Sequence, residues 1–451
     1  MLSSLALLLA IGGAGYVLGH RLRLVPGPLL ALILGALVGC GSPLGTNLLW
    51  STGQALPPEP LNSFRTMGAI LLLWGAGVEL EVGMLRQGRR LLGAAAVGLG
   101  GALCSAGLAW ALLELGILGA FPLSERLGIA LLAAASAIPV LIAIVQSLGQ
   151  LHHPRTRTAL AAALFVDLAI VALIPVVSAE HPEDLPLAHL VKTLGYLALM
   201  IGLAEGPWRN GLRSAGRVIW GSSPRQAVII ALGFGLTLGW VGLAQQLGLD
   251  LVPAALGWGI GSKPLFFPQA EEGPNPFFDA LFPFETSYFA LAGAMLDLRL
   301  VTWGGVLFGL VAIAGKLAGG SVRGAEGLRL GVLLVPRGAV DLVLAVTLLA
   351  NGLLSTSGYA LAVTMIAITT VGGALLARLA FEAPPAEPER VSERPRLGPG
   401  YPSLARADVT CLTAPGCAPS RRRPHQGPTV DQGADPRWVG PRAGSPASGW
   451  R

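Results

Sequence analysis

Apolar stretches bounded by charged residues, Pro and Gly recur along the first 380 residues of the chain. A bilayer core of about 30 Å needs roughly 20 apolar residues per helix, so each stretch predicts a membrane-spanning helix. Thirteen are predicted, at residues 2–19, 26–45, 66–82, 91–115, 126–148, 158–178, 187–205, 226–247, 251–264, 280–298, 303–320, 328–351 and 355–379. The expected fold is an all-α polytopic membrane protein with about 13 transmembrane helices.

The composition supports a membrane protein. Of the 451 residues, 53% are hydrophobic and 12% are charged, whereas an average soluble domain is about 25% charged. A soluble fold is excluded because folded soluble domains must cover their surface with polar groups. The basic residues do not gather in a soluble domain, so the expected partner is the lipid bilayer and not nucleic acid.

The basic residues of the loops predict the orientation of the chain. The loops after the odd-numbered predicted helices carry 14 Lys and Arg residues, whereas the even-numbered loops and their flanks carry only Arg65, Arg126, Lys192 and Arg299. Cytoplasmic loops hold the excess of positive charge. The N-terminus is therefore predicted outside and the C-terminus in the cytoplasm.

The chain divides by composition into two parts. Residues 1–381 hold all of the apolar stretches, whereas residues 382–451 are rich in Pro, Arg and Gly and have almost no apolar runs. Such a composition is typical of disordered segments. We expect a transmembrane domain at 1–381 and a disordered cytoplasmic tail at 382–451.

Two pieces of the transmembrane part are similar in sequence. The segments LLLWGAGVELEV at 71–82 and YFALAGAMLDL at 288–298 share Ala-Gly-x-x-Leu followed by an acid, and a Val-Pro-initiated apolar span precedes each one. The offset is seven helices, and an odd offset reverses the direction of crossing. This predicts two inverted repeats, the architecture of secondary transporters that bind substrate near the midplane between broken helices.

The repeat pairs the fifth predicted helix with the twelfth, and both contain helix breakers. Pro139 lies within residues 126–148, and Pro336 and Gly338 lie within residues 328–351. Proline removes an N–H and frees backbone carbonyls at membrane depth, where they can coordinate an ion. Two ordinary proline kinks are the alternative interpretation.

Two ionisable residues lie deep inside predicted helices. Asp167 is in the middle of the sixth helix, where a carboxylate is costly unless it is hydrated or paired, and where it can exchange a proton for a cation. Lys316, inside the eleventh helix, is a natural counter-charge for a buried acid. The alternatives are a structural hydrogen bond for Asp167 and a side chain that extends to the interface for Lys316.

Three further residues accompany the breaks. Arg337 and Asp341 are four residues apart, so they would face one side of a helix and neutralise each other. Ser136 could offer its hydroxyl to an ion or bond back to its own helix. The chain has no zinc-protease, serine-hydrolase or ATP-binding motif, so we expect no enzyme, no cofactor and no resident metal.

At these residues the chain resembles the sodium/hydrogen exchanger superfamily, and more closely its monovalent cation:proton antiporter-2 branch, which includes glutathione-gated potassium efflux systems. The resemblance covers about residues 1–380 and rests on four motifs in order, Gly77-Val78-Glu79-Leu80, Phe165-Val166-Asp167-Leu168-Ala169-Ile170, Gly315-Lys316-Leu317-Ala318-Gly319-Gly320 and Pro336-Arg337-Gly338-Ala339-Val340. Val166 stands where relatives often have Asp, Asn or Gln, and Ala339 where they have Glu.

The resemblance implies a homodimer with a dimerising panel and a mobile core that carries two crossed, broken helices. It implies exchange of H⁺ for Na⁺ or K⁺ by alternating access, with Asp167 as the shared site. A bacterial-type plasma membrane is the expected location. A cation channel without proton coupling and a non-transporting scaffold or sensor are the alternatives, and the loss of a polar ligand at Val166 motivates the second.

Overall fold

The computed structural model describes residues 2–22, 27–39, 57, 59–80, 82–83, 89–150, 153–178, 186–221, 226–267 and 276–381. The chain forms two compact units, Met1–Pro384 and Pro385–Arg451. All of the described residues belong to the first unit. The predicted tail at 382–451 lies outside the described residues.

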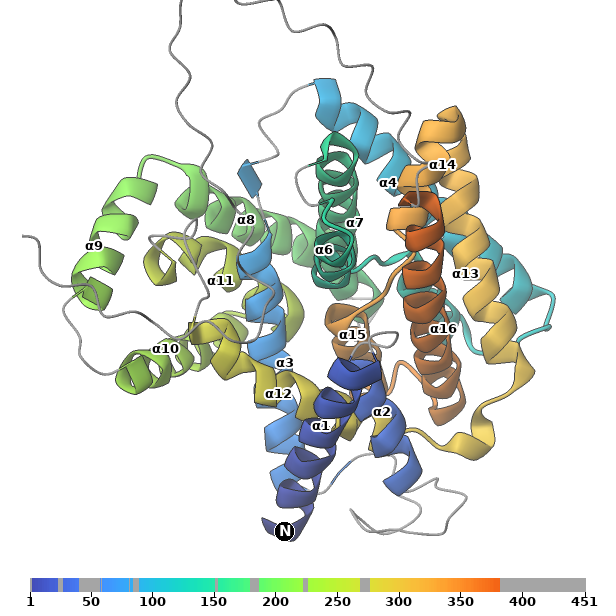
Figure 1. Ribbon diagram of the computed structural model, residues 1–451, viewed down its shortest axis with the longest axis horizontal. Coiled ribbons are helices and arrows are strands. Elements are labelled where there is room, and N and C mark those ends of the chain that lie inside the picture. The colour runs from blue at the N-terminus through green and yellow to red at the C-terminus, as the bar shows by residue number, and fades with distance from the viewer. Residues whose placement is uncertain are drawn as a thin grey trace, which may run out of the picture. The chain divides into compact units, whose positions relative to one another are not determined.

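The regular elements in the described part of the first unit are all helices (Figure 1). Its first nine helices are α1 (Leu2–Leu22), α2 (Gly27–Val38), α3 (Glu59–Glu79), α4 (Arg89–Glu114), α5 (Leu123–Ala134), α6 (Ile138–Ser147), α7 (Pro154–Ser178), α8 (Pro186–Glu205) and α9 (Arg209–Gly221). The others are α10 (Gln226–Gln246), α11 (Leu251–Phe266), α12 (Pro276–Ala294), α13 (Trp303–Ser321), α14 (Gly324–Leu333), α15 (Ala339–Ala350) and α16 (Thr356–Phe381), with a 3₁₀ turn, η2 (Leu298–Leu300). The all-α fold is confirmed.

The length and composition of the helices suit a membrane. Among the described residues, six apolar helical segments are long enough to cross a bilayer, at Leu92–Glu114, Leu123–Gln146, Pro154–Ile174, Leu187–Glu205, Trp303–Ser321 and Thr356–Arg378. Three shorter apolar helices accompany them, at Ser3–Gly19, Gly27–Val38 and Ala339–Ala350. The protein is an integral membrane protein, and the count of thirteen spans stays a prediction.

Helices far apart in sequence pack in pairs. Helix α2 packs against α12, α3 packs against α11, and α4 packs against α13. The predicted repeat relates α2 to α11, α3 to α12 and α4 to α13. Exchanging its two halves converts the α2–α12 pair into the α11–α3 pair and leaves the α4–α13 pair unchanged. The inverted repeat stays a prediction, and this pairing is consistent with it.

Glycine brings α4 and α13 into backbone contact. A Cβ atom on Gly315 would lie 2.4 Å from Ser105 Cα, and one on Gly319 would lie 2.3 Å from Gly101 N. Small residues at such a crossing allow close packing of helices where lipid supplies no hydrophobic drive. The contact fixes the depth of α13, which carries Lys316.

Both predicted breaks are present. Helix α5 ends at Ala134 and α6 begins at Ile138, whereas α14 ends at Leu333 and α15 begins at Ala339. Pro139 lies in the first turn of α6, where its missing N–H would have no helical partner. The residue two before it, Ala137, is extended, with φ −121° and ψ 106°, which ends the helical run before the proline.

One helix has no counterpart among the predicted stretches. Residues 209–221, which the sequence places in a basic loop, form α9. The search for apolar stretches of about 20 residues could not find it, because α9 is short and carries Arg209, Arg213 and Arg217.

Candidate functional site

The two breaks lie against each other. Ala137 N donates to Pro336 O across 3.3 Å, and Ser136 Oγ donates to Leu334 O across 3.4 Å. Each bond joins the gap between α5 and α6 to the gap between α14 and α15. Backbone groups that the breaks remove from helical bonding therefore partly satisfy one another, as buried backbone must be satisfied at membrane depth.

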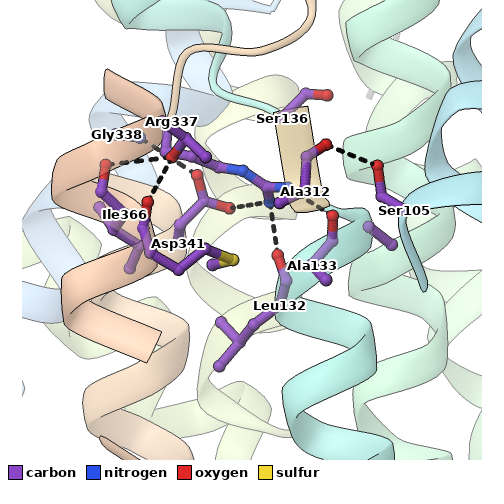
Figure 2. Close-up of polar contacts among 12 residues, drawn as sticks. Ser105, Leu132, Ala133, Ser136, Ala312, Arg337, Gly338, Asp341 and Ile366 are labelled. Carbon is purple, nitrogen blue, oxygen red and sulfur yellow. Dashed lines mark hydrogen bonds and ion pairs between the residues drawn. The ribbon is translucent and has the colours of Figure 1, made fainter. Parts of the chain in front are cut away.

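Arg337 crosses between the two broken helices. Its guanidinium donates to Leu132 O and to Ala133 O, each at 2.5 Å. Figure 2 shows the guanidinium between these carbonyls and the carboxylate of Asp341, whose Oδ1 is 3.8 Å from Arg337 Nη1. The other oxygen of Asp341 accepts from Gly338 N at 3.1 Å, which caps α15. The expected pairing of Arg337 and Asp341 is present.

Lys316, on α13, binds the end of α5 at the same break. Its Nζ donates to Ala134 O at 2.5 Å and to Ser136 Oγ at 2.9 Å, and its side chain is only 1% exposed. The side chain therefore does not extend to an interface. Together, Lys316 and Arg337 bind the carbonyls of three successive residues that end α5.

Asp167 lies on α7 beside this cluster and is 5% exposed. Its carboxylate lies near the backbone N–H of Ser136 and within electrostatic range of Asp341, Lys316 and Arg337. Within the described part of the chain, Lys316 and Asp167 do not form an ion pair of 4.0 Å or less. The lysine therefore acts on Asp167 through its charge and not as a close ion-pair partner.

The charges of the cluster balance when all four groups are ionised. Asp167 and Asp341 contribute two negative charges, and Lys316 and Arg337 contribute two positive charges. A buried charge is tolerated when it is compensated, and removing one member leaves the others uncompensated. The arrangement can accept a proton or a cation at Asp167, which has no ion-pair partner among the described residues, whereas Asp341 lies 3.8 Å from Arg337 and caps α15 through its other oxygen.

The structure thus brings together all five residues that the sequence singled out, namely Ser136, Asp167, Lys316, Arg337 and Asp341. Val166 is fully buried next to Asp167 and supplies no polar side-chain atom, and Ala339 begins α15. Neither residue can act as a ligand through its side chain.

Other groups at the site were not found from the sequence. The carbonyls of Leu132, Ala133 and Ala134 are bound by the protein's own cations, and their side chains give no signal for such a role. Thr370 of α16 donates from Oγ1 to Arg337 O at 2.9 Å. Among the described residues, no group of three His, Cys, Asp or Glu side chains is placed to hold a metal ion.

Comparison with known proteins supplies a family match and a structural match. The model of a family described as the transmembrane sodium/hydrogen exchanger matches residues 5–382. The structure is similar to that of the sodium proton antiporter MjNhaP1 from Methanocaldococcus jannaschii at pH 8, with a TM-score of 0.57 and 18% identity. The match covers 84% of this chain and 97% of the other, and it establishes a shared fold. No curated protein matches the sequence.

Proposed function

The chain belongs to the sodium/hydrogen exchanger family, and from this premise we propose that it exchanges H⁺ for a monovalent cation, Na⁺ or K⁺, across its membrane. Asp167 is the shared site that holds the proton and the cation in turn. Transport proceeds by alternating access, in which the site opens first to one side of the membrane and then to the other. The protein is a transporter and not an enzyme.

The observation that carries this proposal is the position of Asp167. It is buried on an apolar helix, next to two helix breaks that meet at membrane depth. Its carboxylate is within electrostatic range of both buried cations, yet it has no ion-pair partner within 4.0 Å among the described residues. A carboxylate that a permanent partner does not hold is free to bind a proton or a cation.

Lys316 and Arg337 have different roles in this scheme. Arg337 holds the two broken helices together through Leu132, Ala133 and Asp341, which keeps the site in one geometry. Lys316 donates to Ala134 O and Ser136 Oγ. Its positive charge compensates Asp167 while neither a proton nor a cation is bound, so the empty site costs less to maintain in the membrane. The hydroxyl oxygen of Ser136 is an uncharged side-chain oxygen beside Lys316, and it serves as a second ligand for the cation.

Finer features of the proposal rest on the resemblance and on the loop charges. We place the chain in the monovalent cation:proton antiporter-2 branch, with K⁺ as well as Na⁺ as a candidate cation. The working unit is a homodimer in a bacterial-type plasma membrane. The N-terminus lies outside and the C-terminus in the cytoplasm, because the odd-numbered loops carry most of the positive charge.

The test is proton efflux from acid-loaded liposomes that contain the purified protein and a pH-sensitive dye. Addition of external Na⁺ or K⁺ is expected to raise the internal pH for the wild type. Asp167→Asn is expected to abolish this signal while the protein still inserts and elutes as the wild type does, because the amide binds neither a proton nor a cation in exchange.

Glu125→Gln is the matched control. Glu125 is another buried carboxylate, at the opposite end of α5 from the break, where it accepts from Ser355. Its variant should retain exchange. Current that persists in Asp167→Asn without a pH gradient would instead indicate a channel. No cation-dependent signal from inserted wild type with either ion would indicate a scaffold.

A further inference from the structure

Helix α9 differs from the other described helices in composition. It spans Arg209–Gly221, with the sequence RNGLRSAGRVIWG, and joins the C-terminal end of α8 to the start of α10. Both neighbours are apolar helices of about the length that crosses a bilayer. A connection between two such helices lies at one surface of the membrane.

The helical period separates the side chains of α9 into two faces. Arg209, Arg213 and Arg217 are spaced four residues apart and lie on one face with Asn210 and Ser214. Leu212, Ala215 and Val218 lie on the other face. Short helices with arginine on one face and apolar residues on the other lie in the plane of the bilayer interface.

Apolar side chains of α9 are exposed on the surface of the protein. Contact between these side chains and water would be unfavourable. Trp208, which precedes the helix, is 70% exposed, and Val218 is 73% exposed. Tryptophan is enriched at membrane interfaces because its indole has an apolar body and a polar N–H. Exposure of these two side chains is accounted for when they contact the boundary between headgroups and acyl chains.

The helix is also held firmly against a membrane helix. Gly216 packs on α11 so closely that a Cβ atom there would lie 2.3 Å from Leu265 O. Figure 1 shows α9 at the margin of the helices, and it packs beside α8 and α11. Because the Gly216 contact fixes the rotation of α9, the direction of its basic face is fixed as well.

The arginines of the basic face are largely without carboxylate partners. Arg209 pairs with Glu205 at 3.3 Å. Arg217 Nη2 donates to the neutral Ser214 Oγ at 3.3 Å, and Arg213 Nε is buried without a hydrogen-bond partner. Among the described residues, neither Arg213 nor Arg217 pairs with an acid. Guanidinium groups of this kind match phosphate oxygens in charge and in geometry.

We propose that α9 is an interfacial helix that binds the headgroups of anionic phospholipids through Arg213 and Arg217, with Trp208 and Val218 inserted beside them. The ligand is the phosphate of a lipid in the same membrane. The inference does not depend on ion exchange, because it rests on the composition, exposure and packing of α9.

The test is amide hydrogen exchange of the full chain in nanodiscs of phosphatidylcholine, with and without phosphatidylglycerol. For the wild type, the anionic lipid should slow exchange in residues 209–221 by roughly thirtyfold, from the attraction of about 1 kcal/mol that each of two basic residues gains at an anionic surface. Arg213→Gln/Arg217→Gln should lose this lipid dependence. Its melting temperature in detergent without lipid should match that of the wild type.

The matched control is Arg157→Gln/Arg329→Gln, which removes the same charge from two exposed arginines on α7 and α14. It should retain the full effect of phosphatidylglycerol on residues 209–221. Protection that is equal with and without the anionic lipid, or that the control loses equally, would overturn the proposal. Protection that instead rises with protein density in the nanodisc would assign the face to a second copy and would also overturn it.

Discussion

Lys316 Nζ and Ser136 Oγ lie 2.9 Å apart, which ties the middle of α13 to the gap between α5 and α6. The same ammonium group donates to Ala134 O. One lysine therefore satisfies the Ala134 carbonyl, which the break leaves without a helical donor, and a hydroxyl within the break.

Replacing Lys316 separates its hydrogen bonds from its charge. Lys316→Ala should lower the free energy of unfolding by about 1–3 kcal/mol for each acceptor left unsatisfied. Lys316→Gln, which retains a donor, should recover part of this loss. Thermal melting in detergent measures both variants. If the alanine variant melts as the wild type does, the two hydrogen bonds do not stabilise the break.

The same two variants report on the charge. Neither can compensate an ionised Asp167, so both should bind the proton more persistently and require a higher external pH for half-maximal exchange. The liposome assay across a range of pH measures this shift. Exchange with an unchanged pH profile in both variants would remove Lys316 from the transport cycle.

Arg337 and Asp341 offer a double-mutant comparison. Arg337→Met frees Leu132 O and Ala133 O and leaves Asp341 without its ion-pair partner. Breaking a buried pair from one side costs about 3–5 kcal/mol, so the melting temperature should fall steeply. Adding Asp341→Asn should restore part of the stability, because no uncompensated charge remains. A double variant less stable than Arg337→Met would show that the carboxylate does not depend on the arginine.

The contact between α4 and α13 is predicted to be intolerant of a methyl group. Gly319→Ala places a Cβ atom 2.3 Å from Gly101 N, so the two helices must separate, at a cost of about 1–3 kcal/mol. Gly107→Ala, on the same α4, meets open space and should stabilise the helix slightly. Melting of the two variants side by side tests the contact. Equal melting temperatures would contradict it.

Glu125 is predicted to stabilise the start of α16 without taking part in exchange. Its Oε1 accepts from Ser355 N at 2.8 Å and from Ser355 Oγ at 2.6 Å. Glu125→Ala leaves both donors without this acceptor and should cost about 1–3 kcal/mol. Half-saturating cation concentrations in the liposome assay should not change. A weaker apparent cation affinity would place Glu125 in the transport path.

The positions of the breaks could be predicted from sequence because proline and glycine act locally. Pro139 and Pro336 each fall at a break between paired short helices. The pairing of Arg337 with Asp341 was also predictable, since a spacing of four residues places both on one side of a helix. These inferences use only neighbours in the chain.

The partners of Lys316 could not be predicted in the same way. The sequence indicated an acid as its counter-charge, whereas its direct partners are the carbonyl of Ala134 and the hydroxyl of Ser136. They lie about 180 residues away in sequence, and a backbone carbonyl carries no residue-type signal. Helix α9 was missed for another reason, because it is short and carries three arginines, so a search for long apolar stretches excludes it.

The bonds between the two breaks also constrain how the protein is made. In each of these bonds the donor and the acceptor lie about 200 residues apart in the chain. Arg337 donates to Leu132 O and Ala133 O, and Ala137 N donates to Pro336 O. While the ribosome is still translating the segments that follow α5, the carbonyls at its end have no arginine to bind. During insertion they must use water, lipid headgroups or the insertion machinery. The first half of the chain therefore enters the membrane with an unfinished polar centre, which only the arrival of Arg337 completes.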